Sequence, residues 1–195
     1  MVDKLKEVVI VEAKRTPIGT YKGLLKEINA QTLGKIVIKE VLKKNNFHHD
    51  EIDEVIMGQV LTAGAGQNPA RQAAVNAGIP ISKPAHLINQ VCGSGLRAVI
   101  SGYQSIKLGE VKTVISGGQE NMSITPHSIF LKKDEEISKD NLIDTMINDG
   151  LIDAFKNYHM GVTAENIASR FSISRNQQDS FALNSQKKAQ IAITN

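Results

Sequence analysis

The residue with the most distinctive chemistry is a cysteine. Cys92 is the only cysteine among the 195 residues, and a cysteine thiolate is a strong nucleophile. Leu87, Ile88 and Val91 make an apolar run of strand length just before it. Apolar residues with helical spacing follow it and end at Gly109, namely Leu96, Val99, Ile100, Tyr103 and Ile106. We therefore expect Cys92 on a strand-to-helix turn, where the N–H groups of the helix start favour negative charge on the sulfur.

Two glycines flank this cysteine on the helix side. Gly93 and Gly95 leave room for a sharp turn and for close approach of another backbone or a ligand. The helix start primes Cys92 but does not complete its activation, which normally requires a partner base such as histidine. The alternative interpretation from placement alone is an inert, buried cysteine that packs as a small apolar side chain.

The histidines do not supply that base convincingly. His48 and His49 lie in a polar stretch without metal-ligand spacing, and His127 lies in a stretch of little periodicity. His86 begins the strand that leads to Cys92, but six extended residues span about 20 Å, too far for direct contact. We expect no metal site.

Composition excludes several classes of function. The chain has 23 basic and 20 acidic residues and a net charge of +3, with the charges interspersed. The sequence therefore shows no cluster of basic residues of the kind that binds nucleic acid or an anionic membrane. No apolar run has the length of a membrane span. The first seven residues lack the apolar stretch of a secretory signal, and a single cysteine forms no internal disulfide. We expect a cytoplasmic protein.

Strand and helix patterns alternate along the chain. This alternation predicts an α/β fold with a mainly parallel sheet and helices on both faces. Strands are expected at 8–11, as an apolar run covered on both faces, at 55–57, at 87–91 and at 111–115. Helices are expected at 33–45, 69–77, 96–108, 163–171 and 175–193. The stretch 123–146 has little periodicity and reads as an excursion outside the sheet, with the charged run 132–136 as a solvated loop.

Two of these helices have clear end signals. Asn68 is the expected N-cap of a helix that begins at Pro69, buries an alanine face and stops at Gly78. The alanines on that face are Ala70, Ala73, Ala74 and Ala77. Ser174 and Gln177 form a capping box for the last helix, which reaches Asn195 without a stop signal. From this we expect a truncated chain.

Six motifs, taken together, resemble those of the thiolases and follow the same order. They are Arg15-Thr16-Pro17-Ile18-Gly19, Gly58-Gln59-Val60, Gly66-Gln67-Asn68-Pro69-Ala70-Arg71, Asn89-Gln90-Val91-Cys92-Gly93-Ser94-Gly95-Leu96-Arg97-Ala98, Gly117-Gly118-Gln119-Glu120-Asn121-Met122-Ser123 and His159-Met160-Gly161-Val162-Thr163-Ala164-Glu165-Asn166. The resemblance covers essentially the whole chain and is closest to short-chain acetyl-CoA acetyltransferases.

The resemblance implies a thiolase-like fold of which this chain is the N-terminal half. Residues 1–122 would form the N-terminal domain with the nucleophile, and residues 123–195 part of a lobe that covers coenzyme A. In this family Cys92 accepts an acetyl group from acetyl-CoA, and Leu151, His159 and Met160 resemble or lie near residues that line the pantetheine tunnel. Coenzyme A thioesters are substrates, so no cofactor is expected.

The implied reaction joins two acetyl-CoA molecules to give acetoacetyl-CoA and CoA, with thiolysis as the reverse. The activating histidine, a second cysteine and a water-positioning asparagine come from the C-terminal half in this family. The expected assembly is a homodimer or tetramer, with a separate C-terminal half as a possible partner. The chain alone is therefore expected to be incomplete or inactive.

Three alternatives stay open at this point. A decarboxylating or hydroxymethylglutaryl-type synthase uses the same fold, although the motifs favour the thiolase branch. A cysteine hydrolase would need a poised histidine. An inactive thiolase-like remnant that serves as a binding module is favoured by the missing half.

Overall fold

The computed structural model describes residues 7–45, 47–131 and 136–194. The chain separates into two compact units, Met1–Gly150 and Leu151–Asn195. The family-based division between residues 122 and 123 stays a prediction.

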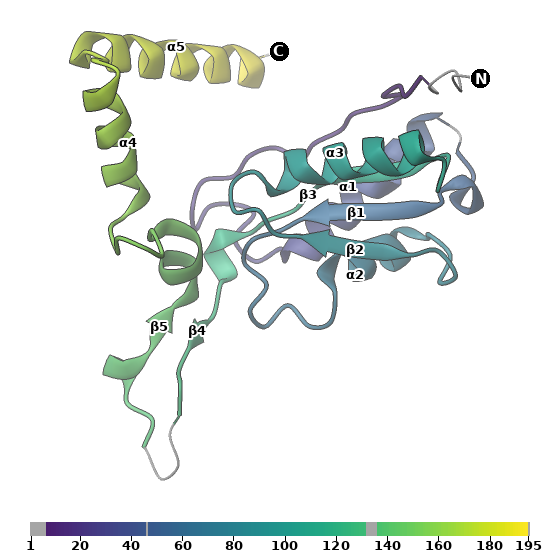
Figure 1. Ribbon diagram of the computed structural model, residues 1–195, viewed down its shortest axis with the longest axis horizontal. Helices are drawn as coiled ribbons and strands as arrows, with labels where there is room; N and C mark the ends of the chain where they lie inside the picture. Colours follow the sequence, from purple (N-terminus) through teal and green to yellow (C-terminus); the bar gives the residue numbers. More distant parts are fainter. Residues whose placement is uncertain (1–6, 46, 132–135, 195) are drawn as a thin grey trace. The chain divides into compact units, whose positions relative to one another are not determined.

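The first unit is built on a three-stranded parallel sheet of order β2-β1-β3 (Figure 1). The strands are β1 (Glu54–Gly58), β2 (Ala85–Ile88) and β3 (Val114–Gly118). The helices that accompany them are α1 (Ala30–Asn45), α2 (Pro69–Ala77) and α3 (Ser94–Leu108). Helix α3 packs on one face of the sheet, and α1 and α2 lie on the other. The predicted α/β class with a parallel sheet and helices on both faces is confirmed.

The core lies between the sheet and the pair α1 and α2. Ile38 and Leu42 of α1 meet Val55 and Met57 of β1 there, together with the predicted alanines Ala70, Ala73, Ala74 and Ala77 of α2. Helix α2 has the predicted ends, since the Asn68 side chain accepts the Arg71 N–H and Gly78 adopts a left-handed φ of 102°. The local signals of this helix were therefore sufficient to predict it.

Helix α1 ends where it was predicted and starts three residues earlier, at Ala30. The buried positions recur every four residues, at Ala30, Gly34, Ile38 and Leu42. The apolar residues Leu33, Ile36, Val37 and Val41 of this helix are partly buried or exposed.

Helix α3 is confirmed in extent, and small residues, not its apolar stripe, face the sheet. The buried residues are small, Ser94, Ala98 and Gly102, whereas Leu96 is 68% and Tyr103 49% exposed. The helix approaches the sheet too closely for larger side chains, because a Cβ on Gly102 would collide with the Ser116 hydroxyl. Small residues therefore face the sheet, and the apolar stripe faces outward.

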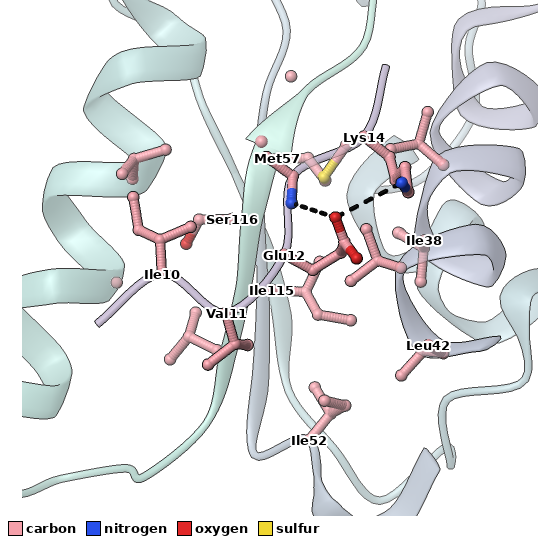
Figure 2. A pocket seen from close by; sticks show the side chains of 18 of the residues that line it. Ile10, Val11, Glu12, Lys14, Ile38, Leu42, Ile52, Met57, Ile115 and Ser116 are labelled. Carbon is pink, nitrogen blue, oxygen red and sulfur yellow. Dashed lines mark hydrogen bonds and ion pairs between the residues drawn. The ribbon is translucent and has the colours of Figure 1, made fainter. Parts of the chain in front are cut away.

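The expected strand at 8–11 is wrong. The structure assigns no strand there, and Ile10 is 80% exposed. Figure 2 shows Ile10 and Val11 beside β3, along a cavity of about 560 Å³ whose lining also includes α1 and α3. Since β1 pairs directly with β3, this segment lies outside that ladder, along a cavity that residues of both α1 and α3 line. Strand pairing depends on such distant partners more than on local preference.

The expected strand at 111–115 begins later than predicted. Strand β3 starts at Val114. The preceding Lys112 and Thr113 donate their N–H groups to Asp53 Oδ2, at 2.8 and 3.1 Å. These bonds occupy the backbone just before the strand, and the ladder starts after them.

The excursion 123–146 lies outside the main sheet, as predicted. It contains a two-stranded antiparallel ladder of β4 (His127–Ser128) and β5 (Ile143–Asp144). The charged run 132–136 falls outside the described residues, apart from the exposed Glu136. The short helical turns of the chain are His49–Glu51, Met122–Ile124, Lys139–Asn141 and Ile147–Leu151.

The second unit contains the helices α4 (Met160–Arg170) and α5 (Arg175–Thr194). Helix α4 starts three residues earlier than predicted. The capping box of α5 is confirmed, because the Ser174 N–H donates to Gln177 Oε1 and the Gln177 N–H to Ser174 Oγ. None of the helices in the described ranges has the length and apolar character needed to cross a membrane.

Candidate active site

Cys92 lies on the turn between β2 and α3, as predicted. Its side chain is exposed in this chain, whereas the alternative of an inert packing residue requires a buried one. Ser94 closes the turn, because its Oγ accepts the Gln90 N–H at 2.9 Å and donates to the Val91 carbonyl at 2.6 Å. The thiol is thereby presented on a short turn fixed at both ends, at the carboxyl edge of a parallel sheet, where α/β proteins commonly bind ligands.

The unusual backbone of this turn is at Val91 and not at the glycines. Val91 has a φ of 48°, in the left-handed region, whereas Gly93 has an ordinary φ of −84°. Gly93 leaves room for the turn without an unusual φ, since a Cβ there would lie 3.3 Å from the Gln90 carbonyl oxygen. A branched side chain in this region is strained and needs support from its surroundings. Part of that support is a hydrogen bond of 2.9 Å from the Val91 N–H to Asn89 Oδ1.

A glycine on the neighbouring strand allows the turn to lie this close to the sheet. A Cβ on Gly58 would collide with the backbone of Ser94 and Gly95. The last residue of β1 is therefore in direct contact with the first turn of α3. The predicted close backbone approach exists, and Gly58 is the residue that makes it possible.

A carboxylate joins the ends of β1 and β3 beside this turn. Glu120, just after β3, accepts the Val60 N–H at 2.8 Å and the Leu61 N–H at 3.2 Å. Burial raises the pKa of Glu120, while the two backbone hydrogen bonds act to lower it. The carbonyl of Val60 accepts a long hydrogen bond of 3.4 Å from Asn89 Nδ2.

The residues on either side of Glu120 also make hydrogen bonds to distant parts of the chain. Gln119 Nε2 donates to Gln59 Oε1 at 2.9 Å, in a buried pair of amides. Asn121 Nδ2 contacts the backbone carbonyls of residues 25, 26 and 28, at 3.0, 3.3 and 2.7 Å. Three consecutive side chains thus tie distant loops to the end of β3. The roles of these three residues were not predicted from the sequence, although polar residues directly after a strand of a parallel sheet are a recognisable signal.

Two histidines of the first unit, His86 and His49, contact groups outside the Cys92 turn. His86 Nδ1 lies 3.2 Å from Glu54 Oε1, at the opposite end of the strands from the Cys92 turn. His49 Nδ1 lies 2.8 Å from the Gly78 carbonyl. Within the described ranges, no three side chains of the metal-binding types are grouped as a metal site would require.

Leu151, His159 and Met160, the expected pantetheine-channel residues, belong to the second unit. A β-bridge between Ile152 and His159 brings Leu151 close to the start of α4. His159 caps this helix, since its Nδ1 accepts the Gly161 N–H at 3.0 Å. Met160 is the first helical residue and is half-buried. Cys92 belongs to the first unit, and a joint role of these residues with Cys92 stays a prediction.

Comparison with known proteins places these observations in a family. The model of the thiolase N-terminal domain matches residues 8–195. An acetyl-CoA acetyltransferase of Chromobacterium violaceum is 51% identical over 187 residues, which are 95% of this chain and 48% of that protein. One of Pseudomonas aeruginosa is 48% identical over 190 residues, or 97% of this chain and 48% of that protein. A cytosolic acetyl-CoA acetyltransferase of Rattus norvegicus is 49% identical over 185 residues, or 95% and 47%.

The chain spans about half the length of the curated relatives it matches. The matched family model nevertheless covers nearly all of it, including the Cys92 turn and the residues after β3. The chain therefore belongs to the thiolase family.

Proposed function

We propose that this chain provides the acyl-accepting half of an acetyl-CoA acetyltransferase, with Cys92 as the nucleophile. The observation that carries the proposal is the exposed thiol on the turn closed by Ser94, at the carboxyl edge of the sheet. Identities near 50% to acetyl-CoA acetyltransferases support the substrate class.

The first step is transfer of an acetyl group to the cysteine. The Cys92 thiolate attacks the thioester carbonyl of acetyl-CoA, and the resulting tetrahedral oxyanion collapses with cleavage of the bond to the CoA sulfur. CoA leaves as a thiolate and takes up a proton, and Cys92 is left as an acetyl thioester. The backbone N–H of Cys92 is the proposed donor to the oxyanion.

The second step forms a carbon–carbon bond. A base removes a proton from the methyl group of another acetyl-CoA, and the carbanion attacks the acetyl-enzyme to give acetoacetyl-CoA and the free thiolate of Cys92. In the family this base is a second cysteine, and the present chain has only one. We assign the step to a C-terminal half that acts together with this chain.

The second unit is proposed to contribute to CoA binding. Leu151, His159 and Met160 would line the channel for the pantetheine arm, and half-buried Met160 offers an apolar contact next to the helix cap at His159. The proposed setting is the cytoplasm, in a homodimer or tetramer that includes the C-terminal half.

Complementation tests the role of Cys92. The chain is mixed with the C-terminal half of the Chromobacterium violaceum relative, and thiolysis of acetoacetyl-CoA is assayed. We expect the mixture to regain turnover toward the roughly 10 s⁻¹ typical of enzymes and Cys92→Ser to abolish it. Ser105→Ala, on the helix that follows, serves as a control and should keep full activity.

Mass spectrometry of the chain alone separates the two steps. With acetyl-CoA we expect slow, incomplete addition of one acetyl group to the wild type, none to Cys92→Ser, and no acetoacetyl-CoA. Near-normal turnover of the Cys92→Ser mixture would contradict the assignment. CoA binding without any acetylation would favour the binding-module alternative.

A further inference from the structure

We propose that Glu120 is a positioning residue that sets the Cys92 turn through the loop after β1. The inference rests on the proposed function only in that Cys92 is the nucleophile. The coupling itself is a statement about the fold and can be measured without any enzymatic turnover.

The first link runs from Glu120 to the loop after β1. Its two carboxylate oxygens accept the N–H groups of Val60 and Leu61, one each, at 2.8 and 3.2 Å. The residue is partly buried, so a lost acceptor would leave these N–H groups poorly satisfied. The carboxylate thus fixes both residues of the loop at once.

The second link runs from this loop to the turn. The Val60 carbonyl accepts from Asn89 Nδ2 at 3.4 Å, and Asn89 Oδ1 accepts the Val91 N–H at 2.9 Å. The Asn89 amide therefore has one end on the loop and the other on the turn. Rotation of this amide would disturb both bonds together.

The third link is the strained backbone next to the thiol. Val91 keeps its φ of 48° only while its surroundings hold it there. If Asn89 is released, Val91 can relax toward negative φ, and Cys92, the next residue, shifts away from the start of α3. The sulfur then loses the favourable effect of the helix N-terminus on its thiolate.

The same sheet provides a matched control at its other end. Asp53 precedes β1 and accepts two backbone N–H groups, from Lys112 and Thr113 before β3. Both carboxylates therefore tie β1 to β3 by a pair of backbone bonds, but only Glu120 lies at the edge that carries Cys92. If both carboxylates only stabilise the sheet, their removal should affect the reactivity of Cys92 equally at the two ends of the sheet.

The experiment measures alkylation of the thiol. Because the chain has one cysteine, the rate of reaction with iodoacetamide reports on Cys92 alone. We expect Glu120→Gln to slow this reaction about two- to five-fold, the size of a helix-terminus effect at a surface. Asp53→Asn should leave the rate unchanged. An unchanged rate in Glu120→Gln, or equal slowing in both variants, would overturn the proposal.

A double-mutant cycle tests the route through Asn89. If the coupling runs through this amide, Glu120→Gln should slow alkylation in the wild-type background and add no further slowing to Asn89→Ala. Independent, multiplicative effects would contradict the route. Circular dichroism of each variant shows that it is folded.

Hydrogen exchange measured by mass spectrometry gives a second readout if a variant is destabilised. Glu120→Gln should raise exchange at residues 60 and 61 and also at 91, whereas Asp53→Asn should raise it at 112 and 113 only. Global unfolding would raise exchange everywhere and is thereby recognised; faster exchange at 60 and 61 with none at 91 would overturn the coupling. These outcomes are independent of acetylation, so failure of the proposed function and failure of this inference can be told apart.

Discussion

The two faces of the main sheet are packed by different means. On the face of α1 and α2, branched side chains such as Ile38 and Leu42 interlock with the alanines of α2. On the face of α3, contact is made by Ser94, Ala98 and Gly102, while bulky residues of the same helix point away. Apolar character decides which side is buried on the first face, and available space decides it on the second.

The difference follows from how near the backbones lie. Helix α3 starts directly on Gly58 and passes Ser116 so closely that a side chain on Gly102 would collide with it. A helix at this distance must present small residues, whatever the apolar character of its other positions. The close approach also holds the Cys92 turn against the end of the sheet, which ties the packing to the proposed chemistry.

The largest effect is expected on the interlocked face. Leu42→Ala removes a buried side chain and leaves a cavity, which should lower the free energy of unfolding by about 2–5 kcal/mol. Urea denaturation measures the loss. Leu24→Ala, at a fully exposed leucine, is the control and should change stability by less than about 0.5 kcal/mol. Equal losses at both leucines would mean that the first face is not the core.

A smaller effect is expected on the close-packed face. Gly102→Val inserts a branched side chain against Ser116 and Val114, and overpacking of this kind costs about 1–3 kcal/mol. Gln104→Val places the same residue on the exposed side of the same helix and should have little effect on unfolding. If Gly102→Val is as stable as its control, α3 does not approach the sheet as closely as described.

The smallest effect on stability is expected from the outer stripe of α3. Leu96→Ser combined with Tyr103→Ser should change the free energy of unfolding by no more than about 0.5 kcal/mol. It should, however, reduce self-association, because exposed apolar surface promotes contacts between molecules. Size-exclusion chromatography with light scattering compares it with Leu24→Ser. If self-association is unchanged in this variant, the surface responsible for it lies outside the apolar stripe of α3.

Local signals predicted the parts of the fold that local chemistry determines. Helix α2 was predicted together with its cap at Asn68 and its stop at Gly78, because both ends and the buried face are encoded within about ten residues. The segment 8–11 was predicted wrongly, since its state depends on how β1 and β3 pair far away in sequence. The sheet-facing side of α3 was not predicted, because helical spacing does not reveal the distance to the sheet.

The site was predictable to a similar extent. The strand-to-helix position of Cys92 followed from the pattern around it, and the role of Cys92 came from the thiolase resemblance. The bonds of Glu120 and of Asn89 to Val60 were not predictable, because they join segments about 30 to 60 residues apart. Such contacts become visible only when the sheet brings the ends of its strands together.

The side chain of Asn121 makes the protein sensitive to irreversible chemical damage on prolonged heating. Its amide group faces the carbonyls of residues 25, 26 and 28, and asparagine is a thermolabile residue. Deamidation, the hydrolysis of this side-chain amide, would replace the N–H donor by a carboxylate that repels the same three oxygens. Prolonged heating would then release the loop 20–29 permanently, in molecules whose sheet is still intact, and the damage would persist after cooling.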